Sequence, residues 1–429
     1  MNKLRISTAI ATFLVFSPSA WATGMAECGE WKPFGEGFNN SIPALHVFDG
    51  DLIALTQFSQ HSDIDGVARW NGEYWEQLGE GLIVHSSIDT LNMLTFEGEL
   101  IAIGPIHLQD ESHFGFVRWD GDSWQAIGNQ SCGGAVTSVA VAGGELYLGL
   151  GNDTDCEHHI DGFDNPLRGV LRWNGAYWSQ VGDTSEFALV GAMVEYDGDL
   201  VITDWNGSAQ IGSIRRWNGE SWEQLGTLEG GGVSALAVYN GDLISGGGFE
   251  SIDGLPLQRI ARYDGEQWLA ITLGMDDAVH DLHVRDGELY AGGRFENVAE
   301  NPVDRLVRWN GLTWVEFEGG ADGIVRSMSS YQGSLVIAGS FSNVGDGVNV
   351  NGVAQFVICP EPITGACCTS SRCIDLTFQA CDAIGGAYLG DDVTCAEVDC
   401  ATCPGDLSVD GVVNVLDLLE LLNAWGSCP

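Results

Sequence analysis

A seven-residue motif recurs along most of the chain and constrains its fold more than any other feature. The motif is Arg-(Trp/Tyr)-(Asn/Asp)-Gly-x-x-Trp, and its copies begin every 44 to 54 residues, at Arg69, Arg118, Arg172, Arg216, Arg262 and Arg308. A second signal occurs seven times: a polar residue or glycine followed by Gly, placed between an apolar run and a Leu. The glycines that end this pair are Gly50, Gly98, Gly144, Gly198, Gly241, Gly287 and Gly333. Repeats of this length are typical of folds in which each unit packs on the next. The sequence therefore predicts seven such units.

One unit contains four strand patterns. Residues 235–239 and 242–247 are separated by Asn240-Gly241, residues that tolerate the positive φ of a tight hairpin turn. A polar loop leads to a third strand over 258–263, and Asp264-Gly265 turns the chain into a fourth around residues 268–271. Four antiparallel strands in each of seven units predict an all-β protein, a seven-bladed β-propeller over residues 28–359.

The two ends of the repeat region predict how the ring closes. The last unit has three strand patterns and no Trp motif, whereas the segment around Trp31 has no preceding partner strand. Phe356 then occupies the place of Trp70 in the first unit, and Trp31 occupies the place of Trp75. We therefore expect the N-terminal strand at Trp31 to be the outermost strand of the seventh blade.

The charge balance limits the partners of the chain. Its 429 residues include 60 Asp and Glu against 17 Lys and Arg, a formal net charge of −43. Such a surface repels phosphate backbones and anionic headgroups, so nucleic acids and membrane surfaces are not expected as partners. Cations, neutral glycans and other proteins remain.

The first 22 residues have the pattern of a secretory signal peptide. Lys3 and Arg5 precede an apolar run from Ile6 to Phe16, and the small-residue site Ala20-Trp21-Ala22 follows. No later stretch reaches the roughly eighteen apolar residues that a membrane span needs. The sequence predicts a secreted, extracellular protein with no membrane span.

Twelve cysteines in an exported chain favour disulfides over free thiols. Cys28 and Cys359 flank the missing turn of the last blade, so we expect them to be bonded. Cys132 and Cys156, in two loops of the third blade, predict a second disulfide rather than two free thiols. Residues 365–400 predict a small module with three disulfides of open connectivity, metal binding being the alternative, among Cys367, Cys368, Cys373, Cys381, Cys395 and Cys400.

The repeat resembles the kelch and galactose-oxidase central-domain type of propeller. The resemblance is carried by Gly247-Gly248, by Gly292-Gly293 and by the paired Trp309 and Trp314, and it covers residues 28–358. It implies the propeller fold. It implies no activity, because fold alone does not determine function and no set of Tyr, Cys and His matches a copper-radical oxidase.

The long and variable loops belong to one face of the predicted propeller, where connections between second and third strands and between blades emerge. They are either solvated acidic loops or a face that binds a glycan or a cation, with Trp205 exposed on it. These loops are residues 59–63, 107–113, 151–164, 204–206 and 275–277.

Histidines and catalytic motifs give little further signal. His158 and His159 are adjacent in an extended loop, where their side chains diverge, so we expect no metal site there. His46 and His283 occupy equivalent positions in the first strands of blades 1 and 6, and we expect them to be packed or to line the channel. The sequence has no Gly-x-Ser-x-Gly and no His-Glu-x-x-His, so no catalytic residue is assigned.

Residues 403–429 carry the most specific chemical pattern. A hard cation needs several converging oxygen ligands, and Gly411 allows the sharp turn of a calcium loop. Loop positions 1, 3, 5, 7, 9 and 12 supply the expected oxygens, from Asp406, Ser408, Asp410, the Val412 carbonyl, Asn414 and Asp417. We therefore expect Ca²⁺ as the cofactor; the alternative is an Asx-rich turn that caps a helix.

This loop, with Val412-Val413-Asn414 and the Leu-rich stretch after it, is similar to one half of a type I dockerin. The resemblance implies an EF-hand-like calcium loop and a cohesin-like partner. One loop-helix segment is visible where a dockerin has two. Cys403 and Cys428 bracket the segment, and we expect them to close it as a disulfide.

These patterns together predict a secreted, non-catalytic binding or scaffold protein. One propeller face would recognise an extracellular glycan or protein ligand, and the dockerin-like tail would attach the molecule to a partner. The alternative is an extracellular polysaccharide-degrading enzyme, a glycoside hydrolase or lyase, because dockerin-like tails accompany such enzymes. A carboxylate pair beside an aromatic side chain would favour the enzyme. A third alternative is that the propeller is only a spacer.

Overall fold

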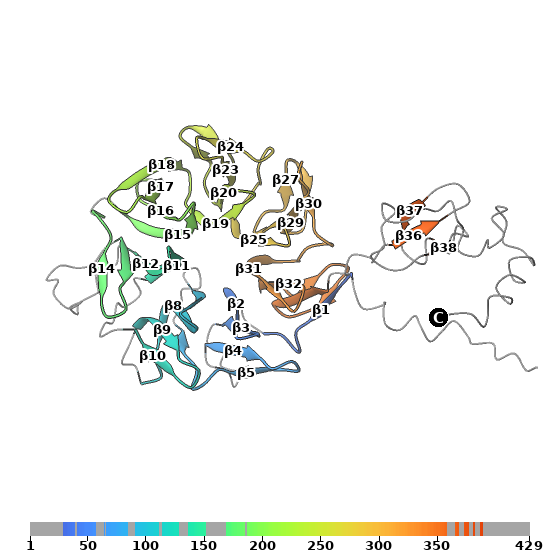
Figure 1. Cartoon of the computed structure of the whole chain (residues 1–429), viewed down its shortest axis with the longest axis horizontal. Coiled ribbons are helices and arrows are strands. Elements are labelled where there is room, and N and C mark those ends of the chain that lie inside the picture. Colours follow the sequence, from blue (N-terminus) through green and yellow to red (C-terminus); the bar gives the residue numbers. More distant parts are fainter. Residues whose placement is uncertain are drawn as a thin grey trace, which may run out of the picture. The chain divides into compact units, whose positions relative to one another are not determined.

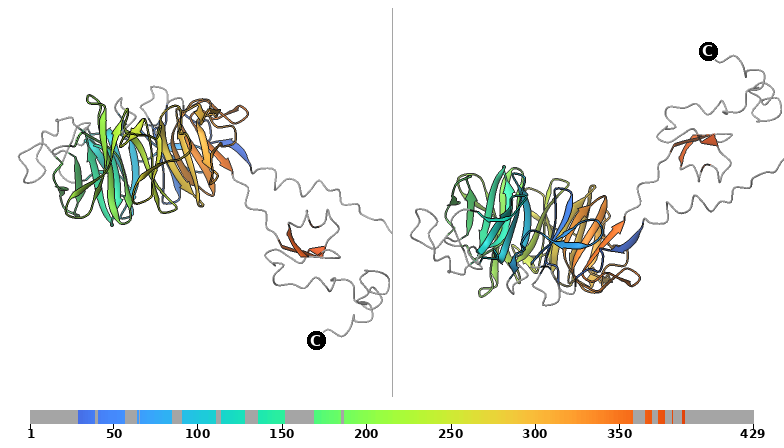
Figure 2. Two further views of the ribbon diagram at one scale, coloured as in Figure 1. Left: turned by 90° about the horizontal axis from the view of Figure 1, so that it is seen from above. Right: turned by 90° about the horizontal axis from the view of Figure 1, so that it is seen from below.

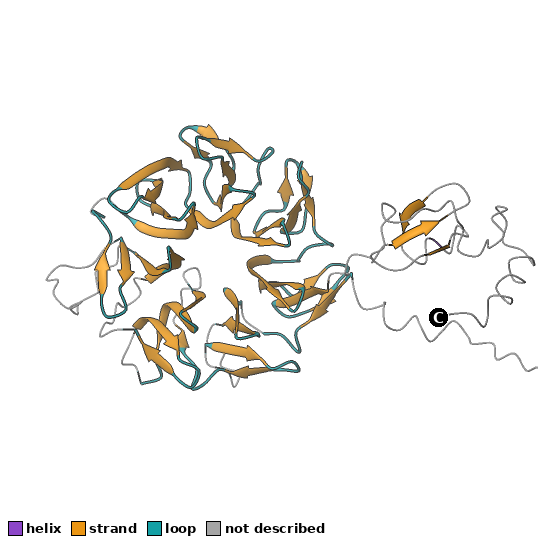
Figure 3. Cartoon of the chain, in the orientation of Figure 1, coloured by secondary structure: helices purple, strands orange, loops and turns teal. Residues whose placement is uncertain are grey.

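The computed structural model describes residues 29–38, 41–56, 64, 66–84, 91–110, 114–127, 136–151, 169–184, 187–357, 365–368, 373–376, 381 and 387–388. The chain divides into two compact units, Met1–Ile358 and Cys359–Pro429. Seven sheets surround a central axis in the first unit (Figure 1), and strands and loops make up its described part (Figure 3). The predicted all-β, seven-bladed propeller with four-stranded blades is confirmed.

The first three blades follow chain order from the channel outward. Blade 1 consists of β2 (Ala44–Phe48), β3 (Asp51–Leu55), β4 (Val67–Trp70) and β5 (Trp75–Gln77). Blade 2 consists of β7 (Asn92–Phe96), β8 (Glu99–His107), β9 (Phe114–Trp119) and β10 (Trp124–Ala126), with β6 (Ile83–Val84) paired to the end of β8. Blade 3 consists of β11 (Val136–Ala142), β12 (Glu145–Leu150), β13 (Val170–Trp173) and β14 (Trp178–Gln180).

The next three blades repeat the same order. Blade 4 consists of β15 (Leu189–Tyr196), β16 (Asp199–Asn206), β17 (Ile211–Trp217) and β18 (Trp222–Glu229). Blade 5 consists of β19 (Val233–Tyr239), β20 (Asp242–Gly247), β23 (Ile260–Tyr263) and β24 (Trp268–Ala270). Blade 6 consists of β25 (Val279–Arg285), β26 (Glu288–Gly293), β29 (Leu306–Trp309) and β30 (Trp314–Glu316).

Blade 7 joins the two ends of the propeller. It consists of β31 (Ile324–Tyr331), β32 (Ser334–Ser340), β35 (Val353–Val357) and, outermost, β1 (Glu30–Pro33). Trp31 pairs with Phe356, as Trp75 pairs with Trp70 in blade 1, so the predicted closure and its register are confirmed. The strands nearest the two ends of the propeller are thus hydrogen-bonded in one sheet, which closes the ring.

Short hairpins decorate the connections between second and third strands in the last three blades. They are β21 (Ser251–Ile252) with β22 (Leu255–Pro256), β27 (Asn297–Val298) with β28 (Asn301–Pro302), and β33 (Asn343–Val344) with β34 (Val348–Asn349). Figure 2 shows the propeller edge-on, with connections emerging on both faces.

The tight turns between first and second strands have the predicted geometry. Asn240 has φ of 53° and Gly241 has φ of 86°, the pair of positive values that a type I′ turn requires. The twist of this turn matches the twist of the two strands that it joins. This match explains why the signal recurs at the same place in every unit.

The apolar core lies between blades rather than within them. Buried side chains form seven clusters, and each cluster combines residues of two neighbouring blades. The last Trp of the motif adds a polar contact, because Trp268 of blade 5 donates its indole N–H to the Leu225 carbonyl of blade 4 at 2.9 Å. Trp222 makes the equivalent bond to the Val181 carbonyl at 2.9 Å. The motif tryptophans are thus mainly core residues.

The arginine of the motif pairs with the acidic residue that follows the turn glycine. Arg308 lies 2.8 Å from Glu288, and Arg118 lies 3.0 Å from Glu99. These side chains are 32 to 42% exposed, and exposed pairs add roughly 0 to 1 kcal/mol each. The repeated ion pairs therefore contribute little to stability.

The second unit contains a three-stranded sheet of β36 (Gly365–Cys368), β37 (Cys373–Leu376) and β38 (Ala387–Tyr388), with β36 in the centre. Cys367 and Cys381 form a disulfide, with Cα atoms 5.6 Å apart. The other predicted pairs, Cys28 with Cys359, Cys132 with Cys156 and Cys403 with Cys428, lie outside the described residues. Within the part of the chain that the structure describes, no helix is long and apolar enough to cross a membrane.

Candidate functional site: the channel mouth

A cavity of about 550 Å³ occupies one mouth of the central channel. It lies where the seven innermost strands begin, the face that also carries the connections between blades and between second and third strands. All seven blades contribute to its lining. The cavity is therefore on the variable face predicted from the sequence, but in its centre rather than on its outer loops.

One residue from each blade forms a ring around this mouth. These seven residues, called here the rim residues, each lie seven positions before the turn glycine of their blade, and all seven line the cavity: Pro43, Leu91, Thr137, Gly191, Ser234, His280 and Arg326. In blades 3 to 7 the register between the first and second strands shifts at this position. Such β-bulges release a side chain from the regular pleat and re-aim it.

The rim position differs from its neighbours in how freely it varies within the chain. The preceding residue is an apolar core residue in six blades and is at most 6% exposed, as in Val279 and Val325. The rim residues are of seven different types, Pro, Leu, Thr, Gly, Ser, His and Arg. Packing between blades therefore constrains the residue before the rim position. It does not constrain the rim residue itself, whose type can differ from blade to blade.

In blades 6 and 7, the residue after the rim position accepts a hydrogen bond from the next blade. Asp281 of blade 6 accepts the backbone N–H of Met328 in blade 7 at 2.6 Å and that of Leu282 at 2.8 Å. At the equivalent place in blade 7, Ser327 Oγ accepts the N–H of Leu45 in blade 1 at 3.0 Å. Burial raises the pKa of Asp281 to about 6, although its two backbone hydrogen bonds favour the charged form.

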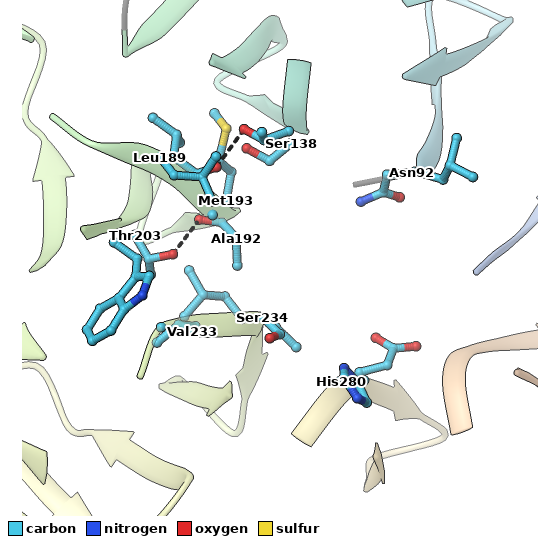
Figure 4. Close-up of a pocket in the computed structure, with 18 of the residues that line it drawn as sticks. Asn92, Ser138, Leu189, Ala192, Met193, Thr203, Val233, Ser234 and His280 are labelled. Carbon is cyan, nitrogen blue, oxygen red and sulfur yellow. Dashed lines mark hydrogen bonds between the residues drawn. The ribbon is translucent and has the colours of Figure 1, made fainter. Parts of the chain in front are cut away.

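An apolar wall faces the polar part of the rim. Trp205, in β16, pairs with Leu189 of β15, and both line the cavity. Leu189 is 40% exposed and Trp205 is partly buried. A methyl group on Gly232 would lie 3.2 Å from Trp205, so glycine there allows the backbone to lie against the indole ring. Figure 4 shows Leu189 and Val233 on one side of the cavity and Asn92 and His280 on the other.

The position of Trp205 corrects one expectation. Asp204, Trp205 and Asn206 were expected in an exposed loop, but they lie in β16 and are paired with β17. Asp204 is 5% exposed and accepts a hydrogen bond from Arg215 Nε at 3.1 Å. Burial raises the pKa of Asp204, while the Arg215 contact acts in the opposite direction. The long continuous pairing of blade 4 holds this segment as a strand.

The described residues of the other predicted variable loops do not line the cavity. Asp276 accepts the backbone N–H groups of Glu296 and Asn297, each at 2.9 Å, and so holds the β27–β28 hairpin. His107 belongs to β8 and not to a loop. Residues 59–63 and 152–164 lie outside the described residues, and with them His158 and His159.

The two histidines of the first strands make equivalent contacts with the next blade. His46 Nε2 lies 2.8 Å from Thr95 Oγ1, and His283 Nε2 lies 2.8 Å from Ser330 Oγ. Burial lowers the pKa of His46, and burial together with Arg285 lowers the pKa of His283 to about 4. The expectation of packed or channel-lining histidines is confirmed; each contacts a different blade, so they form two sites rather than one.

The predicted calcium ligands, Asp406 to Asp417, lie outside the described residues. In the part of the chain that the structure does describe, no three His, Cys, Asp or Glu side chains gather as metal ligands would.

The rim residues lie at the start of the first strands and not in the long loops, so reactive side chains in those loops do not indicate them. The signal was present in the repeat. Aligning the units on the turn glycine gives one column, seven residues earlier, that holds seven residue types directly after a mostly apolar column.

Comparisons with known proteins find structural likenesses at low sequence identity. No protein-family description and no curated protein matches the sequence. Among solved structures, the chain is similar to the computationally designed Ika8 protein at 15% identity, with a TM-score of 0.45 over 76% of this chain and 98% of that one. It is also similar to YCF48 of Cyanidioschyzon merolae, at 12% identity and a TM-score of 0.42 over 76% and 98%. YjhT matches at 12% identity and a TM-score of 0.39 over 65% and 98%.

Proposed function

We propose that this protein is a secreted, non-catalytic binding protein that takes its ligand, an extracellular glycan or protein, at the channel mouth. The observation that carries the proposal is the ring of seven different rim residues on an otherwise repeated scaffold. A concave site that combines an apolar wall with a few convergent polar groups is typical of ligand sites. The pattern of residues 1–22 supports secretion.

The lining of the cavity supports binding over hydrolysis. Glycoside hydrolysis uses two carboxylates that flank the scissile bond. Of the described residues that line the mouth, Asp281 alone carries a carboxylate, and both of its oxygens accept backbone N–H groups. Among the described residues, the cavity walls thus supply groups for recognition and no pair of carboxylates.

A blocking substitution tests this proposal. Ser234→Tyr places a large side chain at an exposed rim position and should abolish binding to glycans or peptides on an array. Ser221→Tyr is the matched control, because it lies on a distant turn where Tyr74 and Tyr177 occupy the equivalent places at 57% and 52% exposure. Unchanged binding by Ser234→Tyr would contradict a ligand site at the mouth.

We propose further that residues 403–429 bind Ca²⁺ and attach the protein to a cohesin-like partner. The alternation of oxygen-bearing residues from Asp406 to Asp417 supports the first part. Calcium titration of the full chain should show a binding event that Asp410→Ala removes. Equal calcium heats for both proteins would contradict it.

A further inference from the structure

The channel mouth has two chemically different sides. His280 and Arg326 occupy the rim in the neighbouring blades 6 and 7. Leu189 and Trp205 form the wall contributed by blade 4. A ligand that fills this cavity must therefore offer a polar or charged group on one side and an apolar face on the other (Figure 4).

The basic side fits a carboxylate. The chain has 60 acidic residues, but none of the seven rim residues is acidic. Two of the seven are basic, Arg326 and His280. The nearby Asp281 carboxylate is engaged with the N–H groups of Leu282 and Met328. Arginine binds carboxylates through a planar fork of donors. At physiological salt, charges more than about 8 Å from these two side chains are largely screened.

The apolar side fits a sugar ring. Trp205 is held between its strand neighbours and the backbone of Gly232, so its indole cannot turn away freely. A rigid indole presents an apolar face to the C–H groups of a pyranose at little cost in conformational entropy. The exposed Leu189 extends this surface.

Short polar side chains lie around the mouth for sugar hydroxyls. Asn92, Thr137 and Ser234 line the cavity, and Thr137 Oγ1 lies 2.6 Å from the Val190 carbonyl, to which it donates. Its lone pairs remain able to accept a hydroxyl. By contrast, a peptide that adds a strand needs a regular edge, and the bulges at the rim interrupt the inner edges in blades 3 to 7.

We infer that the mouth binds an acidic saccharide, a short oligosaccharide whose uronate carboxylate contacts Arg326 and His280 and whose sugar ring packs on Trp205. The inference rests on the proposed function and names the ligand class of that same site.

Calorimetry with three probes tests the inference: trigalacturonate, its methyl ester and neutral galactotriose. The full-length protein should bind trigalacturonate at least about tenfold more tightly than the ester, the loss expected for one charge-assisted contact. Arg326→Gln should bring the two affinities to within about threefold. Trp205→Ala should weaken both by about tenfold and leave their ratio unchanged. Arg294→Gln, on the same face but outside the cavity lining, is the charge-matched control and should change neither.

Equal affinities for trigalacturonate and its methyl ester would overturn the inference. So would a loss of the preference for trigalacturonate in Arg294→Gln that is as large as the loss in Arg326→Gln. So would binding of an acidic peptide by a protein that binds none of the three saccharides. In that case Ser234→Tyr would still block the peptide, and binding at the mouth would stand. If Ser234→Tyr leaves all binding unchanged, the proposed function itself fails.

Discussion

Trp31 Nε1 donates a hydrogen bond to the Glu318 carbonyl at 2.8 Å and so joins residues 287 positions apart. The Trp31 ring also meets Phe356 and Phe317 edge-on, with centroids 5.3 and 6.2 Å away. The side chain is 7% exposed. One tryptophan near the start of the propeller therefore anchors the N-terminal strand to both of the last two blades.

Trp31→Ala should open this closure. Removing a buried Trp side chain costs about 3 to 5 kcal/mol through lost burial and the cavity left behind. The melting temperature, followed by calorimetry, should fall markedly. Trp31→Phe keeps a ring against Phe356 and loses the indole hydrogen bond, so it should cost about 1 kcal/mol. Equal costs for the two variants would show that the contact of the aromatic ring does not hold the strand.

Thr272 has φ of 61° and is expected to be strained. Four residues after the last motif Trp, blades 1 and 3 carry Gly79 and Gly182, both with φ of 64°. A β-branched residue in this conformation costs roughly 1 to 3 kcal/mol. Because glycine also raises the entropy of the unfolded chain, Thr272→Gly should stabilise by about 1 kcal/mol.

The reverse substitution provides the control for this position. Gly182→Thr introduces the same strain, and its Cβ would lie 2.6 Å from Trp217. It should destabilise by more than Thr272→Gly stabilises. Denaturant unfolding of both variants measures the two effects, and a loss of stability in Thr272→Gly would contradict the strain argument.

The fold was predictable because repetition made each element visible several times. The Phe356 and Trp31 alignment predicted the closing register, because the same pair of positions, Trp70 and Trp75, occurs within one unit. The strand position of Trp205 was not predictable, because blade 4 continues its pairing beyond the average strand length. Local sequence does not reveal how far neighbouring strands remain in register.

The site was only partly predictable. The sequence indicated the correct face, but the residues that line the cavity are brought together by bulges in the first strands, at Ser234 and His280 for example. A bulge depends on the pairing of two strands, so single-strand patterns do not show it. The hydrogen bonds that Asp281 and Ser327 accept from neighbouring blades depend on how the blades pack, so the sequence did not predict them either.

Ser327 and Ser138 occupy the same position in blades 7 and 3 but differ in their contacts. Ser327 Oγ accepts the N–H of Leu45, whereas Ser138 Oγ has no hydrogen-bond partner among the described residues. Ser327→Ala should cost about 1 to 3 kcal/mol, because a buried N–H loses its acceptor. Ser138→Ala should be neutral or stabilising. Urea unfolding compares them, and equal effects would contradict a role for the Ser327 bond.

His283 should make stability depend on pH. Its pKa is lowered to about 4, mainly by burial and then by Arg285, against about 6.5 in an unfolded chain. As pH falls below 6.5 the unfolded chain binds the proton first, so the free energy of unfolding decreases until about pH 4. Asp281 acts in the opposite direction, because its raised pKa of about 6 makes the folded state bind a proton first between pH 6 and 4.

Replacing His283 should therefore remove one contribution that lowers the free energy of unfolding as the pH falls. Thermal unfolding of His283→Gln from pH 7 to 4.5 should show a melting temperature that falls less, or rises more, than that of the wild type. The glutamine amide can still reach Ser330, so the contact between blades 6 and 7 is retained. His46→Gln should change the pH dependence in the same direction, because burial also lowers the pKa of His46. If wild type and His283→Gln give parallel curves, His283 does not remain neutral in the folded protein over this range.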